Sequence, residues 1–258
     1  MFRLAIAMII GGGIFTYFNT REFLLDRRAK AEPEAIDLAK LEAGDTPDNP
    51  HLRIGKHFAV YAAGVYEYRK GKNDVGVTPN TKITKYFYPV ISAEHPFFKE
   101  LAELAKQHGG LDNVPDDASW PQINSFRVLV KTTRFPTVGA IPDDIRDVDS
   151  ISGVVINSID PLDKETRNLL LTQFRGADLE NVLVLEDGRK PAGLAWGLAK
   201  VILPLAIALA GVFMLIPRRS DRVPESSQDI LSSENPYAAT DAPQPPGLSH
   251  EPPADGTS

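Results

Sequence analysis

Two uncharged apolar runs, one near each end of the chain, restrict most strongly what it can fold into. The first covers Leu4 to Thr20 and would span roughly 25 Å as a helix, a little less than a ~30 Å hydrocarbon layer. The second covers Val201 to Ile216, and Gly197 to Ala199 extend it across Lys200 to about 20 residues. Each run predicts a transmembrane helix, so we expect an integral membrane protein with two spans.

Basic and aromatic side chains border both runs, as is typical of the membrane interface. We expect interface anchors at Arg3, Arg21, Trp196, Lys200, Arg218 and Arg219. The first run also holds Gly11-Gly12-Gly13, where small residues would allow another helix to approach closely. The alternative is that these glycines are merely tolerated, because glycine is frequent in membrane helices.

The first run also has the pattern of a secretory signal, with Arg3 before an apolar stretch. The small-x-small site Ala29-Lys30-Ala31 lies far downstream, which favours an uncleaved anchor over a cleaved signal. Basic residues follow both runs, so the positive-inside rule gives opposing indications for the two spans. We expect both termini in the cytoplasm and the central part outside, because a chain without cysteine suits an oxidising compartment.

Changes in composition divide the chain into consecutive parts. They are an N-terminal anchor (1–22), a juxtamembrane segment (23–44), a folded domain (45–190), a second span (193–217) and a tail (218–258). Pro33 to Leu41 in the juxtamembrane segment predicts a short helix. The tail is rich in Pro and Ser and cannot bury enough apolar surface to fold, so we expect disorder there. Its Ser233 to Tyr237 is either a docking peptide or solvated linker.

Alternation of apolar and polar residues predicts a β-rich central domain. The expected strands are Leu52–Ala62, Val65–Arg69, Ile83–Ile91, Phe126–Thr132, Ile151–Ile156 and Asn181–Leu185. Two amphipathic helices are expected, at Pro96–His108 and at Pro161–Phe174, the second capped by Asp160. Pro89 indicates that its strand lies at a sheet edge or ends there. Because strands mostly follow one another, we expect an α+β fold with a mixed or antiparallel sheet, either open or curled into a partial barrel.

Composition excludes several classes of chemistry. The absence of cysteine excludes disulfides, cysteine-ligated zinc, iron–sulfur clusters and thiol nucleophiles. A net charge of −6 without a basic block argues against nucleic acid as a partner. The five histidines lack metal-binding spacing, and the acidic run Pro142–Asp149 fits a solvated turn better than a calcium loop. We therefore expect no metal and no cofactor.

A cluster of five tyrosines is the main candidate for a binding surface: Tyr61, Tyr66, Tyr68, Tyr86 and Tyr88. Tyrosine combines apolar area with a polar tip, so such a face could bind a peptide, a lipid headgroup or a glycan. The alternative is that these rings form cross-strand pairs inside the sheet.

Glu94 and His95, just before a predicted helix, form the one acid/base pair with catalytic character. A structural loop histidine is the alternative explanation. No nucleophile or phosphate-binding loop accompanies the pair, so we assign no catalytic residue.

The chain resembles a group of uncharacterised bacterial membrane proteins with two spans and an outer domain, in Tyr86–Ile91, Glu94–Pro96 and Gly153–Lys190. Asn235-Pro236-Tyr237 is similar to a motif in the proline-rich tails of such proteins. This resemblance implies a bacterial inner-membrane location and no particular activity. A second similarity, in layout only, is to the Surfeit-locus assembly factors of cytochrome oxidase, whose sequence motifs are not evident here.

These features together predict a membrane-tethered, non-enzymatic interaction or assembly protein that acts at the bilayer surface. Tethering raises effective concentration, so a tight interface is not required. The expected partners are the lipid bilayer and another membrane or envelope protein. The alternative is an envelope enzyme or accessory subunit that uses Glu94 and His95 as acid and base.

Overall fold

The protein is described by a computed structural model that covers residues 2–69, 76–115, 117–175 and 177–216. The expectations for the tail, including Asn235-Pro236-Tyr237 and the anchors Arg218 and Arg219, fall outside these residues.

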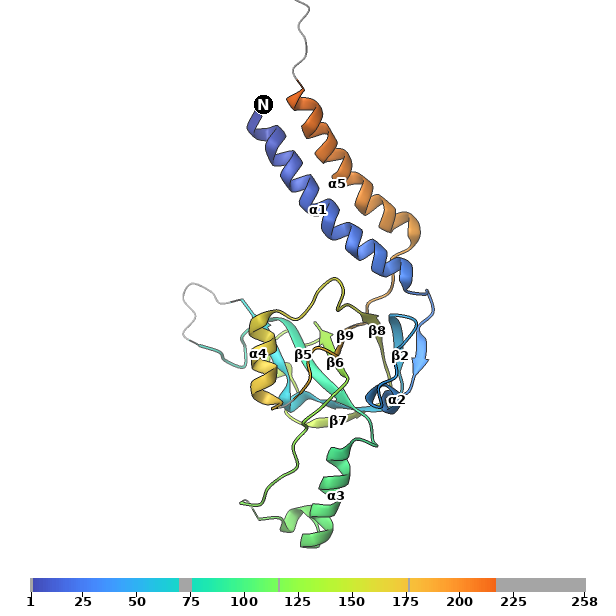
Figure 1. The fold of residues 1–258 in the computed structure, drawn as a ribbon. Coiled ribbons are helices and arrows are strands. Elements are labelled where there is room, and N and C mark those ends of the chain that lie inside the picture. The colour runs from blue at the N-terminus through green and yellow to red at the C-terminus, as the bar shows by residue number, and fades with distance from the viewer. Residues whose placement is uncertain (1, 70–75, 116, 176, 217–258) are drawn as a thin grey trace, which may run out of the picture. The chain divides into compact units, whose positions relative to one another are not determined.

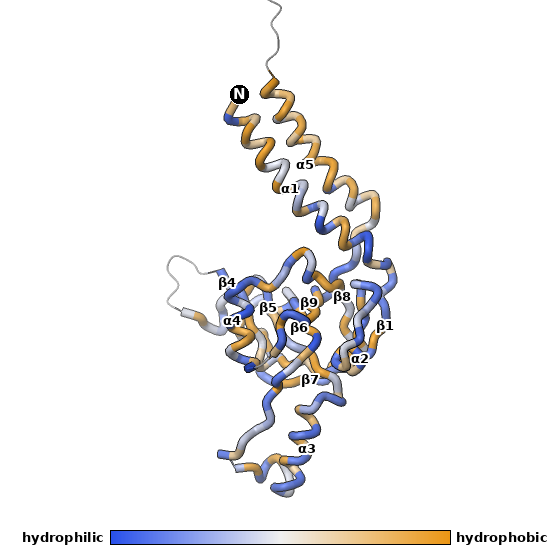
Figure 2. Tube along the Cα trace, in the orientation of Figure 1, coloured by the Kyte–Doolittle hydropathy of each residue, from blue (hydrophilic) through white to orange (hydrophobic). Residues whose placement is uncertain are grey.

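Two long apolar helices lie side by side, α1 (Phe2–Arg28) and α5 (Leu194–Leu215) (Figure 1). Both are long and apolar enough to cross a membrane. Figure 2 shows α5 as hydrophobic along most of its length, whereas α1 is hydrophobic in its N-terminal part and becomes hydrophilic toward Arg28. Phe15 and Phe213 are 64% and 72% exposed. Apolar surface of this extent is typical of helices that lie in lipid.

Small residues allow α1 and α5 to touch through their backbones. A Cβ atom added at Gly12 would lie 2.8 Å from the Ala208 nitrogen and from the Pro204 oxygen. Gly211 is equally close to α1, because its added Cβ would lie 2.8 Å from the Ala5 oxygen. Gly11 and Gly13 have open space instead. The glycine triplet therefore contributes to helix packing through its middle residue.

In the described residues, nine strands form one curled mixed sheet in the order β1-β2-β8-β9-β6-β5-β3-β7, with β4 beside β5. Their bounds are β1 Glu34–Ile36, β2 His51–Ile54, β3 His57–Val60, β4 Val65–Tyr68, β5 Ile83–Ile91, β6 Val128–Thr132, β7 Ile145–Val148, β8 Ile151–Val155 and β9 Leu183–Asp187. The β1–β2 and β6–β9 pairs are parallel and the other pairs are antiparallel. The expected α+β fold with a partial barrel between two long apolar helices is confirmed.

Period-two alternation along β5 places apolar side chains on both faces of the sheet. Tyr86, Tyr88 and Val90 belong to one buried cluster, whereas Phe87 and Ile91 belong to the other. The sheet is therefore covered on both faces where β5 runs through it.

Helices complete both clusters. Leu38 and Leu41 of α2 (Leu38–Glu42) join the Tyr86 cluster, and Leu170 of α4 (Lys164–Gln173) joins the Phe87 cluster. Leu25 of α1, which is 6% exposed, also belongs to the Phe87 cluster. The end of the first apolar helix is thus part of the domain core. The remaining helices are α3 (Pro96–His108) and the 3-10 turns η1 (Tyr61–Ala63), η2 (Leu111–Asn113) and η3 (Val138–Ala140).

The expected first strand is two strands. The chain breaks at Gly55-Lys56, so that β2 pairs with β8 whereas β3 pairs with β5 and β7. Lys56 interrupts the apolar series at this corner, and the series resumes with Phe58 and Val60 in the same period, so the two strands resemble a single one in the sequence.

The expectation of an edge strand at Pro89 is wrong, because β5 lies between β6 and β3. Proline is accommodated there by a local gap on one side of β5. β3 pairs with Val90 and Ile91, β4 pairs only as far as Phe87, and neither has a ladder partner for Pro89. The missing N–H therefore interrupts no pairing on that side.

Two further boundaries differ from the expected ones. Pro33 to Leu41 divides into β1 and α2, with the Asp37 side chain accepting from the Ala39 nitrogen as a cap. The domain sheet thus begins at Glu34, within the expected juxtamembrane segment. The acidic run Pro142–Asp149, read as a turn, contains β7, an exposed strand paired with β3.

Candidate functional site

The structure divides the five candidate tyrosines between the core and the surface. Tyr86 and Tyr88 are 1% and 4% exposed, and burial raises the pKa of both hydroxyls. The Tyr86 hydroxyl donates to the Tyr61 carbonyl oxygen, and the Tyr61 ring centroid lies 4.6 Å from that of Tyr88. The five rings therefore do not form one exposed face. Tyr68 is exposed, whereas Tyr66, like Tyr61, is partly buried against the Tyr86 cluster.

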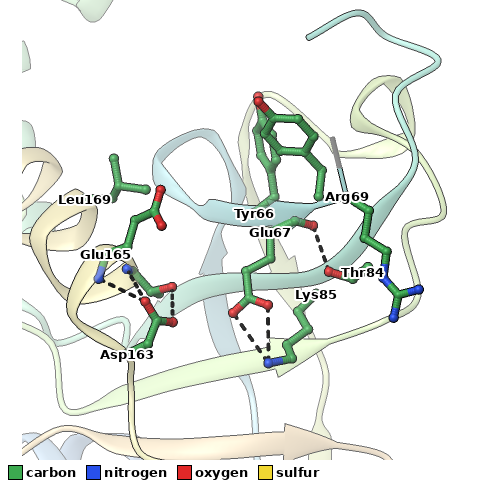
Figure 3. Close-up of a pocket in the computed structure, with 10 residues that line it drawn as sticks. Tyr66, Glu67, Arg69, Thr84, Lys85, Asp163, Glu165 and Leu169 are labelled. Carbon is green, nitrogen blue, oxygen red and sulfur yellow. Dashed lines mark hydrogen bonds and ion pairs between the residues drawn. The ribbon is translucent and has the colours of Figure 1, made fainter. Parts of the chain in front are cut away.

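Tyr66 and Tyr68 border a groove between β4, β5 and the start of α4 (Figure 3). The groove has a volume of 610 Å³, and the two ring centroids are 6.2 Å apart. A neighbouring hollow of 350 Å³ shares both tyrosines and Leu169 of α4. Leu169 is 48% exposed, so the groove offers aromatic and aliphatic surface to solvent.

Charged residues line the rest of this groove, and several already have partners. Glu67 and Lys85 form an ion pair at 3.2 Å across β4 and β5. Asp163 caps α4 by accepting from the Glu165 and Thr166 nitrogens at 2.9 Å, and the bond from the Thr166 nitrogen is the main reason why the pKa of Asp163 is low. Aromatic residues are enriched in protein interfaces whereas Lys, Glu and Asp are depleted there, so the tyrosine side of this groove is the part that suits a protein partner.

His95 has no free ring nitrogen with which it could act as an acid or base beside Glu94. His95 is 4% exposed and caps α3, its Nδ1 accepting from the Phe97 nitrogen at 3.2 Å. Its Nε2 lies 3.0 Å from the Ser125 carbonyl oxygen and donates to it in the matching tautomer. Glu94 is exposed. Both ring nitrogens thus have structural partners, which supports the structural alternative.

An ionic network joins the domain to the two apolar helices. We call it the junction cluster. It comprises four carboxylates, namely Glu22 and Asp26 of α1, Asp160 before α4 and Glu186 of β9, and three cations, namely Lys131 of β6, Arg189 after β9 and Lys200 of α5. Lys131 bridges Asp160 at 2.8 Å and Glu186 at 3.0 Å. Arg189 bridges Glu186 at 2.9 Å and Glu22 at 3.0 Å. Lys131 and Arg189 therefore each link two segments that are far apart in the sequence.

Burial and pairing act in opposite directions on the pKa values of the junction cluster. Burial is the largest influence on Glu186 and disfavours its charge, but hydrogen bonds from Arg189 and Lys131 outweigh it and lower the pKa. The same balance raises the pKa of Lys131, where Asp160 and Glu186 overcome burial. Both groups are therefore held in their charged forms.

Asp160 belongs to this cluster rather than to the helix that it was expected to cap. The α4 helix begins three residues later, after Asp163. The carboxylate of Asp160 accepts instead from Lys131, which has an almost buried side chain. The pairing of a buried lysine explains why Asp160 is held outside the helix.

The expected interface anchors within the described residues have different surroundings. Arg3 and Trp196 are exposed, whereas Lys200 lies 3.6 Å from Glu22. Arg21 donates to the Ser158 carbonyl oxygen and lies 5.8 Å from the centre of the Tyr17 ring. Arg21 and Lys200 thus contact the protein itself.

Among the described residues, no group of three His, Asp or Glu side chains could hold a metal ion. The rings of His51 and His57 lie 2.9 Å and 2.7 Å from the carbonyl oxygens of Lys30 and Gly55. Burial lowers the pKa of His57. Both histidines are therefore engaged in backbone contacts.

The sequence patterns do not indicate that Glu22, Asp26, Lys131 and Glu186 form a connected set. The available signal was a charged residue at an inward position of an apolar strand, as at Lys131 in the run VLVKT. Such a residue requires a partner, but the partners come from segments far apart in the sequence.

No protein-family model, no curated protein and no solved structure matches the chain. The resemblances to bacterial two-span proteins and to the Surfeit-locus factors therefore stay predictions.

Proposed function

We propose that the chain is a membrane-anchored, non-enzymatic interaction or assembly protein whose domain is held at the bilayer surface by α1 and α5. The observation that carries this proposal is the continuity of α1, which runs without interruption from exposed apolar residues to the domain core. Leu25 packs in the core, and Glu22 pairs with Arg189 at 3.0 Å.

Contacts after the helix extend this connection. The Lys30 nitrogen donates to the Asn49 side chain at 3.0 Å, and the Lys30 carbonyl oxygen lies 2.9 Å from the His51 ring. Cleavage after Ala31 would remove Leu25, Glu22 and the Lys30 contacts from the domain. These contacts support an uncleaved anchor over a removable signal.

We further propose a bacterial inner-membrane location with both termini in the cytoplasm and the domain outside. The absence of cysteine supports an oxidising side for the domain and also provides a direct test. A single cysteine at exposed Glu103 of α3 should react with a membrane-impermeant maleimide in spheroplasts. A single cysteine at Ser226 in the tail should react only after the membrane is opened. The reverse pattern would overturn the proposed sidedness.

The groove beside Tyr66 and Tyr68 is the proposed contact surface for a membrane or envelope protein. Its support is the apolar surface that Tyr68 and Leu169 expose beside the groove, at 38% and 48%. A photo-crosslinking amino acid at Tyr68 should give a discrete adduct in intact membranes. The matched control is Ile145, which is 37% exposed against 38% for Tyr68 and lies on β7. The same adducts from both positions, or none from Tyr68, would argue against this surface.

A further inference from the structure

A cavity of 380 Å³ lies at the junction cluster, where the apolar helices meet charged residues. Its lining includes Glu22, Asp26, Glu186, Arg189, Lys190 and Lys200. Carboxylates and cations thus face the same space, and ion pairs within the protein account for most of them.

Most of the charged side chains that line the cavity have a partner within the protein. Glu186 accepts from Lys131 and Arg189, and Glu22 pairs with Arg189 and, at 3.6 Å, with Lys200. Asp187, which also lines the cavity, accepts from Thr132 and Arg134. Among the described residues, three charged lining groups form no hydrogen bond: Asp26, Lys190 and Lys200, of which Lys200 has the ion pair with Glu22.

Asp26 is the least expected of these groups, because it is buried. Its side chain is 5% exposed, and its buried Oδ1 has no hydrogen-bond partner. The nearest cation is Arg189, whose Nη2 lies 3.7 Å from Oδ1, beyond hydrogen-bond range. A buried carboxylate without a donor is unfavourable, so this site is suited to an additional cation or N–H donor.

The charged groups of the cavity limit the chemical class of a ligand that could bind there. The carboxylates are not grouped for a metal ion among the described residues. Lys190 is exposed and suits a phosphate as a point charge. A buried carboxylate without a hydrogen-bond donor and an exposed ammonium group therefore complement a molecule that carries both an ammonium and a phosphate group.

The helix sequences indicate where such a molecule would come from. Lys200 marks the last charged position of α5 before the apolar run Val201 to Leu215, and Trp196 nearby is 65% exposed. In a bilayer, this level corresponds to the headgroup region. The cavity presents both carboxylates and cations at this level, so it can contact both charged groups of a zwitterionic lipid headgroup.

We infer that the junction cavity binds the headgroup of a phosphatidylethanolamine-type lipid, with its primary ammonium at Asp26 and its phosphate at Lys190. A primary ammonium donates three hydrogen bonds, whereas the quaternary ammonium of choline donates none. The inference rests on the proposed membrane placement of α1 and α5, but it requires no protein partner.

The test uses the full chain purified in mild detergent, with bound lipid measured by native mass spectrometry. Phosphatidylethanolamine should be retained on the order of tenfold more than phosphatidylcholine with the same acyl chains, because a charge-assisted hydrogen bond is lost with choline. Asp26→Asn should reduce this ratio to near one, and Lys190→Gln should weaken retention of both lipids. Asp45→Asn, at an exposed residue outside the cavity, should leave the ratio unchanged.

Further measurements distinguish a membrane lipid from a soluble compound with the same headgroup. Soluble glycerophosphoethanolamine at the same concentration should not displace the lipid, and equal displacement would contradict a membrane source. Equal retention of the two lipids by the wild-type chain would overturn the inference even if Asp26→Asn fails to fold. A chain that remains in membranes but shows no lipid preference would refute this inference alone and not the proposed anchoring.

Discussion

Arg189 donates to Glu22 across 3.0 Å, and this ion pair connects the segment after β9 to the apolar helix α1. The same guanidinium donates to Glu186 at 2.9 Å, so that a single side chain links the sheet to the helix. The position of the domain at the end of α1 therefore depends on charged contacts as well as on the packing of Leu25.

Replacement of Arg189 by alanine should destabilise the folded chain by about 3 kcal/mol, because it removes the cation beside buried Asp26 and one of the two cations that pair with Glu186. Unfolding in mild detergent provides the measurement. Arg146→Ala is the matched control, since Arg146 and Asp144 pair at 2.8 Å with side chains 54% and 49% exposed. That change should cost less than about 1 kcal/mol. Similar losses for both variants would contradict the role given to Arg189.

Acid should weaken the junction cluster through Glu186. The folded-state pKa of Glu186 is below its ordinary value of 4.5, so its contribution is complete above that value and is lost as the pH falls through the lower folded pKa. The free energy of unfolding should therefore decrease below about pH 4.5. Glu186→Gln should flatten this decrease, whereas Glu103→Gln at an exposed position should not. An unchanged pH profile in Glu186→Gln would show that the carboxylate does not titrate as described.

Gly12→Ala should weaken the helix pair, since the added Cβ would lie 2.8 Å from backbone atoms of α5. We expect a loss of about 1–3 kcal/mol, the usual range for overpacking. Gly13→Ala has no neighbour within 4 Å and should cause no loss. Thermal unfolding of both variants in the same detergent compares them directly. Equal stability would mean that α1 and α5 do not pack through Gly12.

The tyrosines should separate into a core pair and a surface pair. Tyr86→Ala should cost about 3–5 kcal/mol because it removes a fully buried ring. Tyr68→Ala should change stability by no more than about 0.5 kcal/mol, since its side chain is at the surface. Chemical denaturation measures both. A strong effect at Tyr68 would place that residue in the core and remove it from the proposed contact surface.

Local patterns predicted much of this fold. The run at Ile83–Ile91 and the helix at Pro96–His108 have the predicted bounds, because each carries its own period and its own start and stop signals. Gly109, for example, ends α3 in the left-handed region at φ 71°.

The contacts that the sequence did not reveal are those between distant segments. Pro89 indicated an edge strand, but its place in the sheet depends on where β3 ends and β4 begins. Asp160 has the features of a helix cap, yet a buried lysine 29 positions away uses its carboxylate. Local propensity does not identify such partners.

The tyrosine cluster shows the same limit. Tyr86 and Tyr88 alternate with Phe87 along β5, and both faces of that strand are buried. Their sequence is compatible with an exposed aromatic face or with a core, and the neighbouring layers decide between the two.

The most direct test of the anchoring is the intact mass of the protein that stays in membranes after alkaline carbonate extraction. We expect the chain to remain in the membrane fraction with the α1 residues still attached. Release into the supernatant, or a mass that corresponds to a chain starting after Ala31, would contradict it.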